Sequence, residues 1–153
     1  MNRHVTRRLL ATLLGGAALL VTGATATGAG NSITLNLTGG RSQQKTACSA
    51  LHHYAAYHKG RRLRMTGYVS PAPNLPDGTW RVKIKVKQCK GGRFVPVWET
   101  HVFGKSAVVN GVNVGQFRMT YRMRRRGYFF ARAYYYGYSP SIESQEEHFH
   151  VTR

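Results

Sequence analysis

Acidic residues are scarce in this 153-residue sequence. It has five Asp and Glu residues against 23 Lys and Arg. Asp77 lies in a Pro-Asp-Gly turn, which accounts for it, and three of the four glutamates cluster between residues 143 and 147. Glu99 and His101 share one face of a predicted strand, as a general base and its partner would, but no nucleophile accompanies them. The sequence therefore offers no paired carboxylates for acid–base catalysis.

Catalytic motifs are missing as well. The sequence has no Gly-x-Ser-x-Gly elbow, no phosphate-binding loop and no His-Glu-x-x-His motif. His148-x-His150 places two imidazoles on one strand face, but no spacing signature supplies further metal ligands. We therefore predict a non-catalytic protein without metal or cofactor, and keep a hydrolase using Glu99 and His101 as an alternative.

Long apolar runs are lacking, with one exception near the N-terminus. Leu9 to Ala24 is nearly free of polar groups and follows the basic residues Arg3, Arg7 and Arg8. The run is short of the roughly 20 residues that a membrane span requires. Ala24-Thr25-Ala26 fits a signal-peptidase site. The pattern predicts a secretory signal peptide over residues 1–26, no integral membrane segment after processing, and a secreted or cell-envelope location.

Only two cysteines are present, Cys48 and Cys89. They lack the Cys-x-x-Cys spacing of a redox pair, and in an oxidising compartment an isolated pair forms a disulfide. We predict a structural Cys48–Cys89 bridge that closes a loop of 41 residues.

Positive charge is what the chain has in excess. Once the basic residues of the signal peptide are set aside, the net charge remains near +15. A charge this large on a small domain attracts polyanions. The expected partner is an anionic polymer, that is, a cell-wall polymer, an acidic polysaccharide or nucleic acid. The alternatives are a surface that serves solubility alone and a secreted antimicrobial or toxin-like effector acting on anionic membranes.

The apolar pattern indicates β-structure. We predict a flexible leader over residues 27–45, with an edge strand within Ile33–Leu37, and a folded domain over residues 46–153. Residues 46–59 fit either a helix or a strand. Apolar residues then alternate with charged ones, which is typical of half-buried strands. The predicted strands cover residues 61–69, 80–87, 94–103, 117–124, 128–136 and 147–152, with a glycine-rich break at 110–115.

The order of these features resembles the immunoglobulin-like or fibronectin-type sandwiches of exported bacterial proteins. The resemblance rests on Gly67-Tyr-Val-Ser-Pro71, Trp80-x-Val-x-Ile-x-Val86, Gly91-Gly-Arg-Phe-x-Pro96, Gly115-Gln-Phe117 and Gly127-Tyr-Phe-Phe-Ala-Arg-Ala-Tyr134. It implies an all-β, immunoglobulin-like antiparallel β-sandwich of about seven strands. It implies no activity, because this architecture hosts unrelated functions.

The same order places the strand at 128–136 between the strands at 80–87 and 147–152. Their outward side would carry a cationic row, an aromatic row and His148 with His150. Aromatic and cationic side chains together hold sugar polymers and single-stranded nucleic acid. The predicted binding residues are Arg81, Lys83, Lys85, Lys87, Arg132, Tyr134 and Tyr136, with Arg124, Arg125 and Arg126 as a secondary patch suited to phosphate or sulfate. Alternatively, the aromatic row, which includes Tyr128 and Phe130, is covered by the leader or by residues 46–59, or only strengthens the sheet.

Overall fold

The computed structural model describes residues 30–74 and 79–153, so the predicted signal peptide and the Asp77-Gly78 turn lie outside it. Every regular element in the described part is a β-strand, which confirms the all-β class. It follows that no described helix is long and apolar enough to cross a bilayer. The strands are β1 (Ser32–Ile33), β2 (Asn36–Thr38), β3 (Arg41–Ala47), β4 (Ala50–His58), β5 (Arg62–Ser70), β6 (Trp80–Lys90), β7 (Arg93–Val109), β8 (Val112–Arg122), β9 (Gly127–Tyr135), β10 (Ile142–Glu143) and β11 (Glu147–Thr152).

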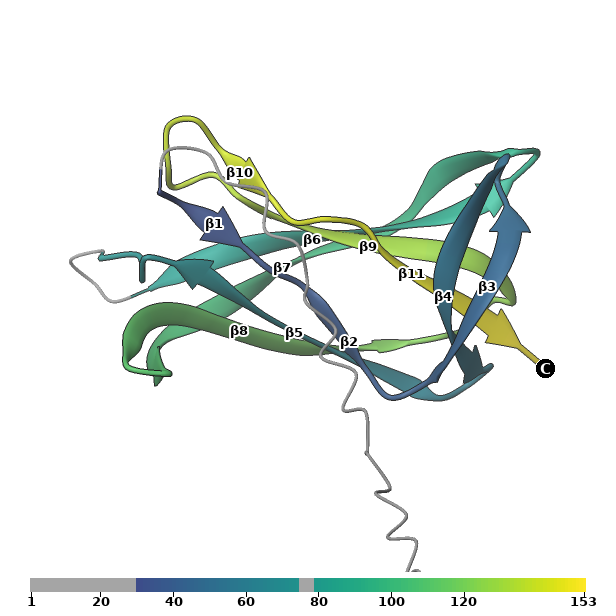
Figure 1. Cartoon of the computed structure of the whole chain (residues 1–153), viewed down its shortest axis with the longest axis horizontal. Helices are drawn as coiled ribbons and strands as arrows, with labels where there is room; N and C mark the ends of the chain where they lie inside the picture. Colours follow the sequence, from purple (N-terminus) through teal and green to yellow (C-terminus); the bar gives the residue numbers. More distant parts are fainter. Residues whose placement is uncertain (1–29, 75–78) are drawn as a thin grey trace, which may run out of the picture.

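All the described strands are hydrogen-bonded into one mixed sheet. Its order is β1-β5-β8-β7-β6-β9-β11-β4-β3, with β2 beside β5 and β10 beside β9. The pair β11–β4 is parallel, and the other pairs are antiparallel. The long strand β7 pairs with β6 up to Gly104 and with β8 beyond it, so it connects the two halves of the sheet (Figure 1). The immunoglobulin-like sandwich stays a prediction.

Buried residues from several strands form one hydrophobic core cluster. Val82, Ile84 and Val86 of β6 are fully buried, as their alternation with Lys83, Lys85 and Lys87 predicts. Leu63 and Met65 of β5 belong to the same buried cluster, as do Phe117 of β8, Phe129 of β9 and Phe149 of β11. The strands at 80–87, 128–136 and 147–152 are neighbours in the predicted order, because β9 lies between β6 and β11.

Residues 30–45 are part of the folded domain, which corrects the prediction of a flexible leader ending at residue 45. β1 and β2 pair with β5, and β3 pairs with β4. Ile33 and Leu35 are buried in the core. The predicted edge strand within Ile33–Leu37 is therefore present in β1 and β2, whereas the Gly- and Ser-rich composition around it concealed the pairing of β3.

Two ambiguous segments are strands. Residues 50–58 form β4, which answers the choice between helix and strand left open for residues 46–59. The predicted break at 110–115 is shorter than expected, because only Asn110 and Gly111 turn and Val112–Gly115 already pair as part of β8. Asn110 and Gly111 both have positive φ, which suits a two-residue hairpin turn.

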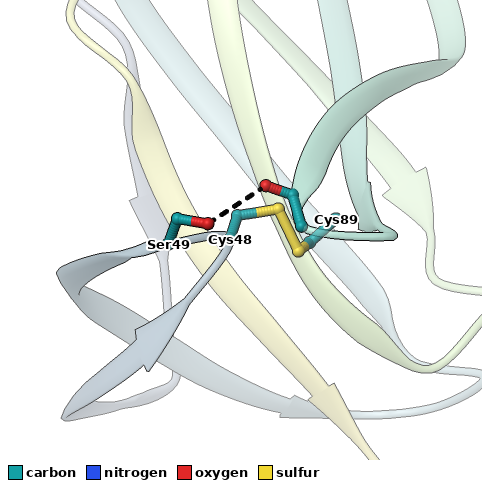
Figure 2. Close-up of a disulfide and its surroundings, with 4 residues drawn as sticks. Cys48, Ser49 and Cys89 are labelled. Atoms are coloured by element: carbon teal, nitrogen blue, oxygen red, sulfur yellow. Dashed lines mark hydrogen bonds between the residues drawn. A yellow bond between two sulfur atoms is a disulfide. The ribbon is translucent and has the colours of Figure 1, made fainter.

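The predicted disulfide between Cys48 and Cys89 is confirmed. Figure 2 shows the bridge joining the turn between β3 and β4 to the end of β6. The hydroxyl of Ser49 adds a weak link by donating to the carbonyl of Gly92, at 3.5 Å. The bridge thus fixes the β3–β4 hairpin against the tip of the β6–β7 hairpin.

Candidate functional site

The residues of the predicted binding face lie on the outer side of β6 and β9, beside β11. Arg81 is exposed, and Lys83, Lys85 and Lys87 are half-buried on that side, while the alternate residues of β6 enter the core. The register places Lys83 opposite Tyr134 and Lys85 opposite Arg132. The structure therefore brings the predicted lysine row and aromatic row together on adjacent strands.

One end of this face is covered by β4. The N-terminal part of β4 precedes the stretch Ala55–His58 that pairs with β11. In this part, Tyr54 contacts Tyr128 with 4.9 Å between ring centroids, and His52 stacks on His148 at 3.9 Å. Phe94 of β7 contacts Phe130 of β9 at 4.8 Å. These contacts agree with the alternative that residues 46–59 cover part of the aromatic row. We call the set the aromatic cluster; it comprises His52, Tyr54, Phe94, Tyr128, Phe130, His148 and His150.

Burial keeps His148 neutral within the aromatic cluster. Burial is the main reason that its pKa falls from 6.5 to about 4, and the charges of His52 and Arg132 lower it further. Glu146 lies 3.3 Å from Nε2 of His148, which would favour the protonated form, but its effect is outweighed. The folded state therefore binds this proton less readily than the unfolded state does.

Acidification is expected to destabilise the fold through His148. Between pH 6.5 and pH 4 the unfolded chain takes up this proton first, so the free energy of unfolding falls as the pH falls. The slope contributed is at most about 1.4 kcal/mol per pH unit. Urea unfolding at several pH values would measure it, with His148→Gln as the matched variant. An equal pH dependence in the variant would contradict this assignment.

The other end of the face is open but contains ion pairs. Lys83 lies 3.1 Å from Glu99. The guanidinium of Arg132 donates to Glu143 and to Glu146, both at 2.8 Å. These contacts commit two of the predicted cationic residues to carboxylates of the same chain.

Aromatic and cationic groups do meet at this open end. Lys85 lies over the ring of Tyr134, with Nζ 5.0 Å from the centroid, and Tyr134 stacks on Tyr136 with nearly parallel rings. Tyr136 is 57% exposed. Lys87 lies over Phe130 of the aromatic cluster, and Arg81 over Phe103. The exposed rings here are therefore fewer than the sequence predicted.

The secondary patch lies between β8 and β9. Arg124, Arg125 and Arg126 are exposed in the connection, and the carbonyl of Arg126 accepts a hydrogen bond from Nε2 of Gln88. Arg124 and Arg125 border a groove of about 410 Å³. The groove is lined by Val97, Trp98, Thr120, Tyr121, Arg122, Arg124 and Arg125.

Sequence reasoning missed a second cationic face, on the outer side of β5 and β8. Arg62 and Arg64 of β5 and Arg118 and Arg122 of β8 are exposed there. Arg62 lies directly opposite Arg122 in the strand register. We call these four residues the arginine face. The alternation of arginine with apolar residues was visible in both segments, but the pairing of β5 with β8 was not.

The carboxylates in the described part of the chain lie on or beside other strands. Glu99 lies on β7, Glu143 on β10, Glu146 next to β11, and Glu147 on β11, where burial raises its pKa. In residues 30–74 and 79–153, the ion pairs found involve Lys83, Arg132 and His148, and none involves the arginine face. The same residues contain no group of three or more potential ligands placed to hold a metal ion.

No protein-family model matches the chain, and no curated protein matches it significantly.

Proposed function

We propose that the chain is an exported, non-catalytic module that binds an anionic polymer of the cell envelope or its surroundings. The single observation that carries this proposal is the arginine face, where four exposed arginines lie on two paired strands with no carboxylate contact among the described residues. Export is supported by the disulfide, which oxidising compartments favour. An immunoglobulin-like sandwich, in which β7 passes from one layer to the other, is the fold that we propose for it.

The arginine face is unfavourable for the protein alone. Arg62 and Arg122 are cross-strand neighbours, and like charges directly opposite each other destabilise a sheet. Arg64 lies diagonally between Arg118 and Arg122, which adds to the repulsion. A polymer with closely spaced negative charges would remove this repulsion on binding and would release its counterions. The polymer classes that fit are cell-wall polymers, acidic polysaccharides and nucleic acid.

The face of β6 and β9 is the weaker candidate for a polyanion. Lys83 and Arg132 already contact carboxylates, and those carboxylates repel negative charge. Its stacked pair Tyr134–Tyr136 would serve instead as a secondary contact for rings of a bound chain.

The test compares two triple variants with equal changes in net charge. Binding to purified cell wall, an acidic polysaccharide and single-stranded DNA is measured with the mature protein, residues 27–153. Arg64→Glu, Arg118→Glu and Arg122→Glu together are expected to weaken binding at least about 100-fold, because each reversal places like charges against the polymer. All three positions are exposed, so the fold is expected to persist, which circular dichroism would check.

Reversal of the lysine row is the matched control. Lys83→Glu, Lys85→Glu and Lys87→Glu together alter the net charge equally but leave the arginine face intact. We expect this variant to lose less than about 10-fold in affinity, as for a change in long-range attraction alone. A greater loss of affinity in the lysine variant would show that the polymer binds to the face of β6 and β9. Equal losses of affinity in the two variants would indicate a generic effect of net charge.

One observation favours a membrane-active effector as the second candidate. Val108 is 73% exposed and Val112 is 53% exposed, and both flank the β7–β8 turn. An exposed apolar hairpin tip on a basic protein suits contact with an anionic bilayer. Leakage of dye from anionic vesicles at low protein concentration would favour this function over polymer binding.

A further inference from the structure

The groove beside the arginine face arises where β7 and β8 separate. The two strands pair from Gly104 to Val109 and from Val112 to Phe117. The part of β7 that precedes Gly104 pairs with β6, whereas the part of β8 that follows Phe117 pairs, among the described strands, only with β5. Val97 and Trp98 on β7 and Tyr121 on β8 therefore border a gap between diverging strands.

A β-bulge shapes the aromatic wall of this groove. The β6–β7 register shifts between Val86 and Lys87, so that Val97 has no partner opposite it. Val97 and Trp98 are consecutive, yet both pack against the core and line the groove. Bulges commonly redirect a side chain in this way next to functional sites. The rings of Trp98 and Tyr121 lie 4.9 Å apart at 50° and form a continuous aromatic surface.

The rim of the groove is cationic. Arg122, Arg124 and Arg125 line it, and its lining includes no carboxylate. Arg124 and Arg125 line the same groove as Tyr121 and act on it electrostatically. Burial raises the pKa of its phenol, and the charges of Arg125 and Arg124 act in the opposite direction.

The cations of the groove and of the arginine face are all arginine, whereas the row on β6 after Arg81 is lysine. A guanidinium presents a planar fork that matches the oxygens of phosphate, sulfate or carboxylate with two parallel hydrogen bonds, whereas an ammonium acts as a point charge. Arginine at every cationic position of the groove therefore favours an oxyanion that accepts two parallel hydrogen bonds, a class to which phosphate and sulfate esters belong.

We propose that this groove binds a phosphate or sulfate ester attached to a ring, with the ester between Arg124 and Arg125 and the ring against Tyr121 and Trp98. The inference rests on the proposed function, since the ester would be one unit of the polymer lying on the arginine face. A volume of about 410 Å³ is at the lower end for ligand pockets and accommodates one ring with its ester.

Trp98 provides a direct readout of binding. It is one of two tryptophans, and the other, Trp80, is 3% exposed in the core. The full mature protein is titrated with phenyl phosphate and, separately, with phenyl sulfate, while tryptophan emission is recorded. We expect a saturable change with a Kd of about 1 mM, which is typical of so small a ligand. The two esters distinguish a phosphorylated from a sulfated source.

Two double variants test the assignment of the ester site. Arg124→Gln with Arg125→Gln is expected to raise the Kd for the preferred ester at least tenfold. Lys90→Gln with Lys105→Gln removes the same charge at two exposed positions outside the groove and the arginine face, and is expected to leave the Kd within about twofold, because exposed charges at a distance are screened. Phenol, which lacks the ester, is expected to give no saturable change.

Three results would overturn the proposal. These are the absence of a saturable change with both esters, an equal response to phenol, and an unchanged Kd in the variant of Arg124 and Arg125. If the esters do not bind while the reversal of Arg64, Arg118 and Arg122 still abolishes polymer binding, the groove assignment fails alone. If the esters bind but no polymer does, the proposed function fails and the groove is a site for small anions.

Discussion

Replacing both Cys48 and Cys89 by serine is expected to lower the free energy of unfolding by about 4 kcal/mol. The bridge spans 41 residues, and a crosslink of that span removes conformational entropy from the unfolded chain. Denaturant unfolding of the double variant against the wild-type protein measures the loss. An unchanged unfolding midpoint would show that the unfolded chain gains little freedom from the missing bridge.

The loss of stability without the disulfide is expected to be largest in the β3–β4 hairpin. This hairpin is fixed at one end by the parallel pairing of β4 with β11 and at the other by the disulfide. Without the bridge, Tyr54 and His52 lose the restraint that holds them over Tyr128 and His148. Hydrogen exchange is expected to increase in β3 and β4 before it increases in β6. Ser49→Ala, which removes only the 3.5 Å contact to Gly92, is the control and is expected to change stability by less than about 0.5 kcal/mol.

Binding to the polymer is expected to weaken about 10³-fold when the salt concentration rises from 50 to 200 mM. The arginine face and the groove together offer six arginines, and about six contacts to a polyanion produce a loss of this size through counterion release. The slope of log affinity against log salt concentration measures the number of contacts. A slope near zero would mean that ionic contacts contribute little and would contradict the proposed function.

Single substitutions refine this measurement. Arg64→Gln and Arg118→Gln are each expected to reduce the slope by about one, because each removes one ionic contact. Arg81→Gln is the matched control, since Arg81 is exposed on the β6 side and lies over Phe103. It is expected to leave the slope unchanged. A reduced slope in this control would place the polymer on the lysine row.

Local alternation predicted the central strands well. The strand at 147–152 has the predicted bounds, and β5, β6 and β9 differ from theirs by a few residues. These strands alternate between apolar and charged residues, so one face of each must be buried. Arg132 was also placed correctly on the outer side, because a charged residue at this position would be costly to bury.

Pairing between distant segments could not be predicted in the same way. β3 has few apolar residues, and it is a strand because β4 pairs with it. The cover over Tyr128 and Phe130 depends on where the pairing of β4 with β11 begins. The ion pairs of Lys83 and Arg132 depend on the pairing of β6 with β7 and of β9 with β10 and β11. The arginine face likewise needs β5 beside β8, which no local pattern specifies. The alternation of residues along each strand predicted which side of the sheet a side chain faces. Its neighbours on that side depend on which strands pair, and the sequence alone does not specify that pairing.

The uneven distribution of acids has a consequence for how the protein approaches a surface. Four described carboxylates lie on or beside β7, β10 and β11, while the charged residues on the outer side of β5 and β8 are all arginine. The molecule therefore has an electric dipole in addition to its net charge. In the field of a negatively charged wall or fibre, that dipole would turn the arginines towards the surface before contact. The stacked pair Tyr134–Tyr136 lies on another part of the sheet, at β9 beside β6, and so would stay free for a contact of its own.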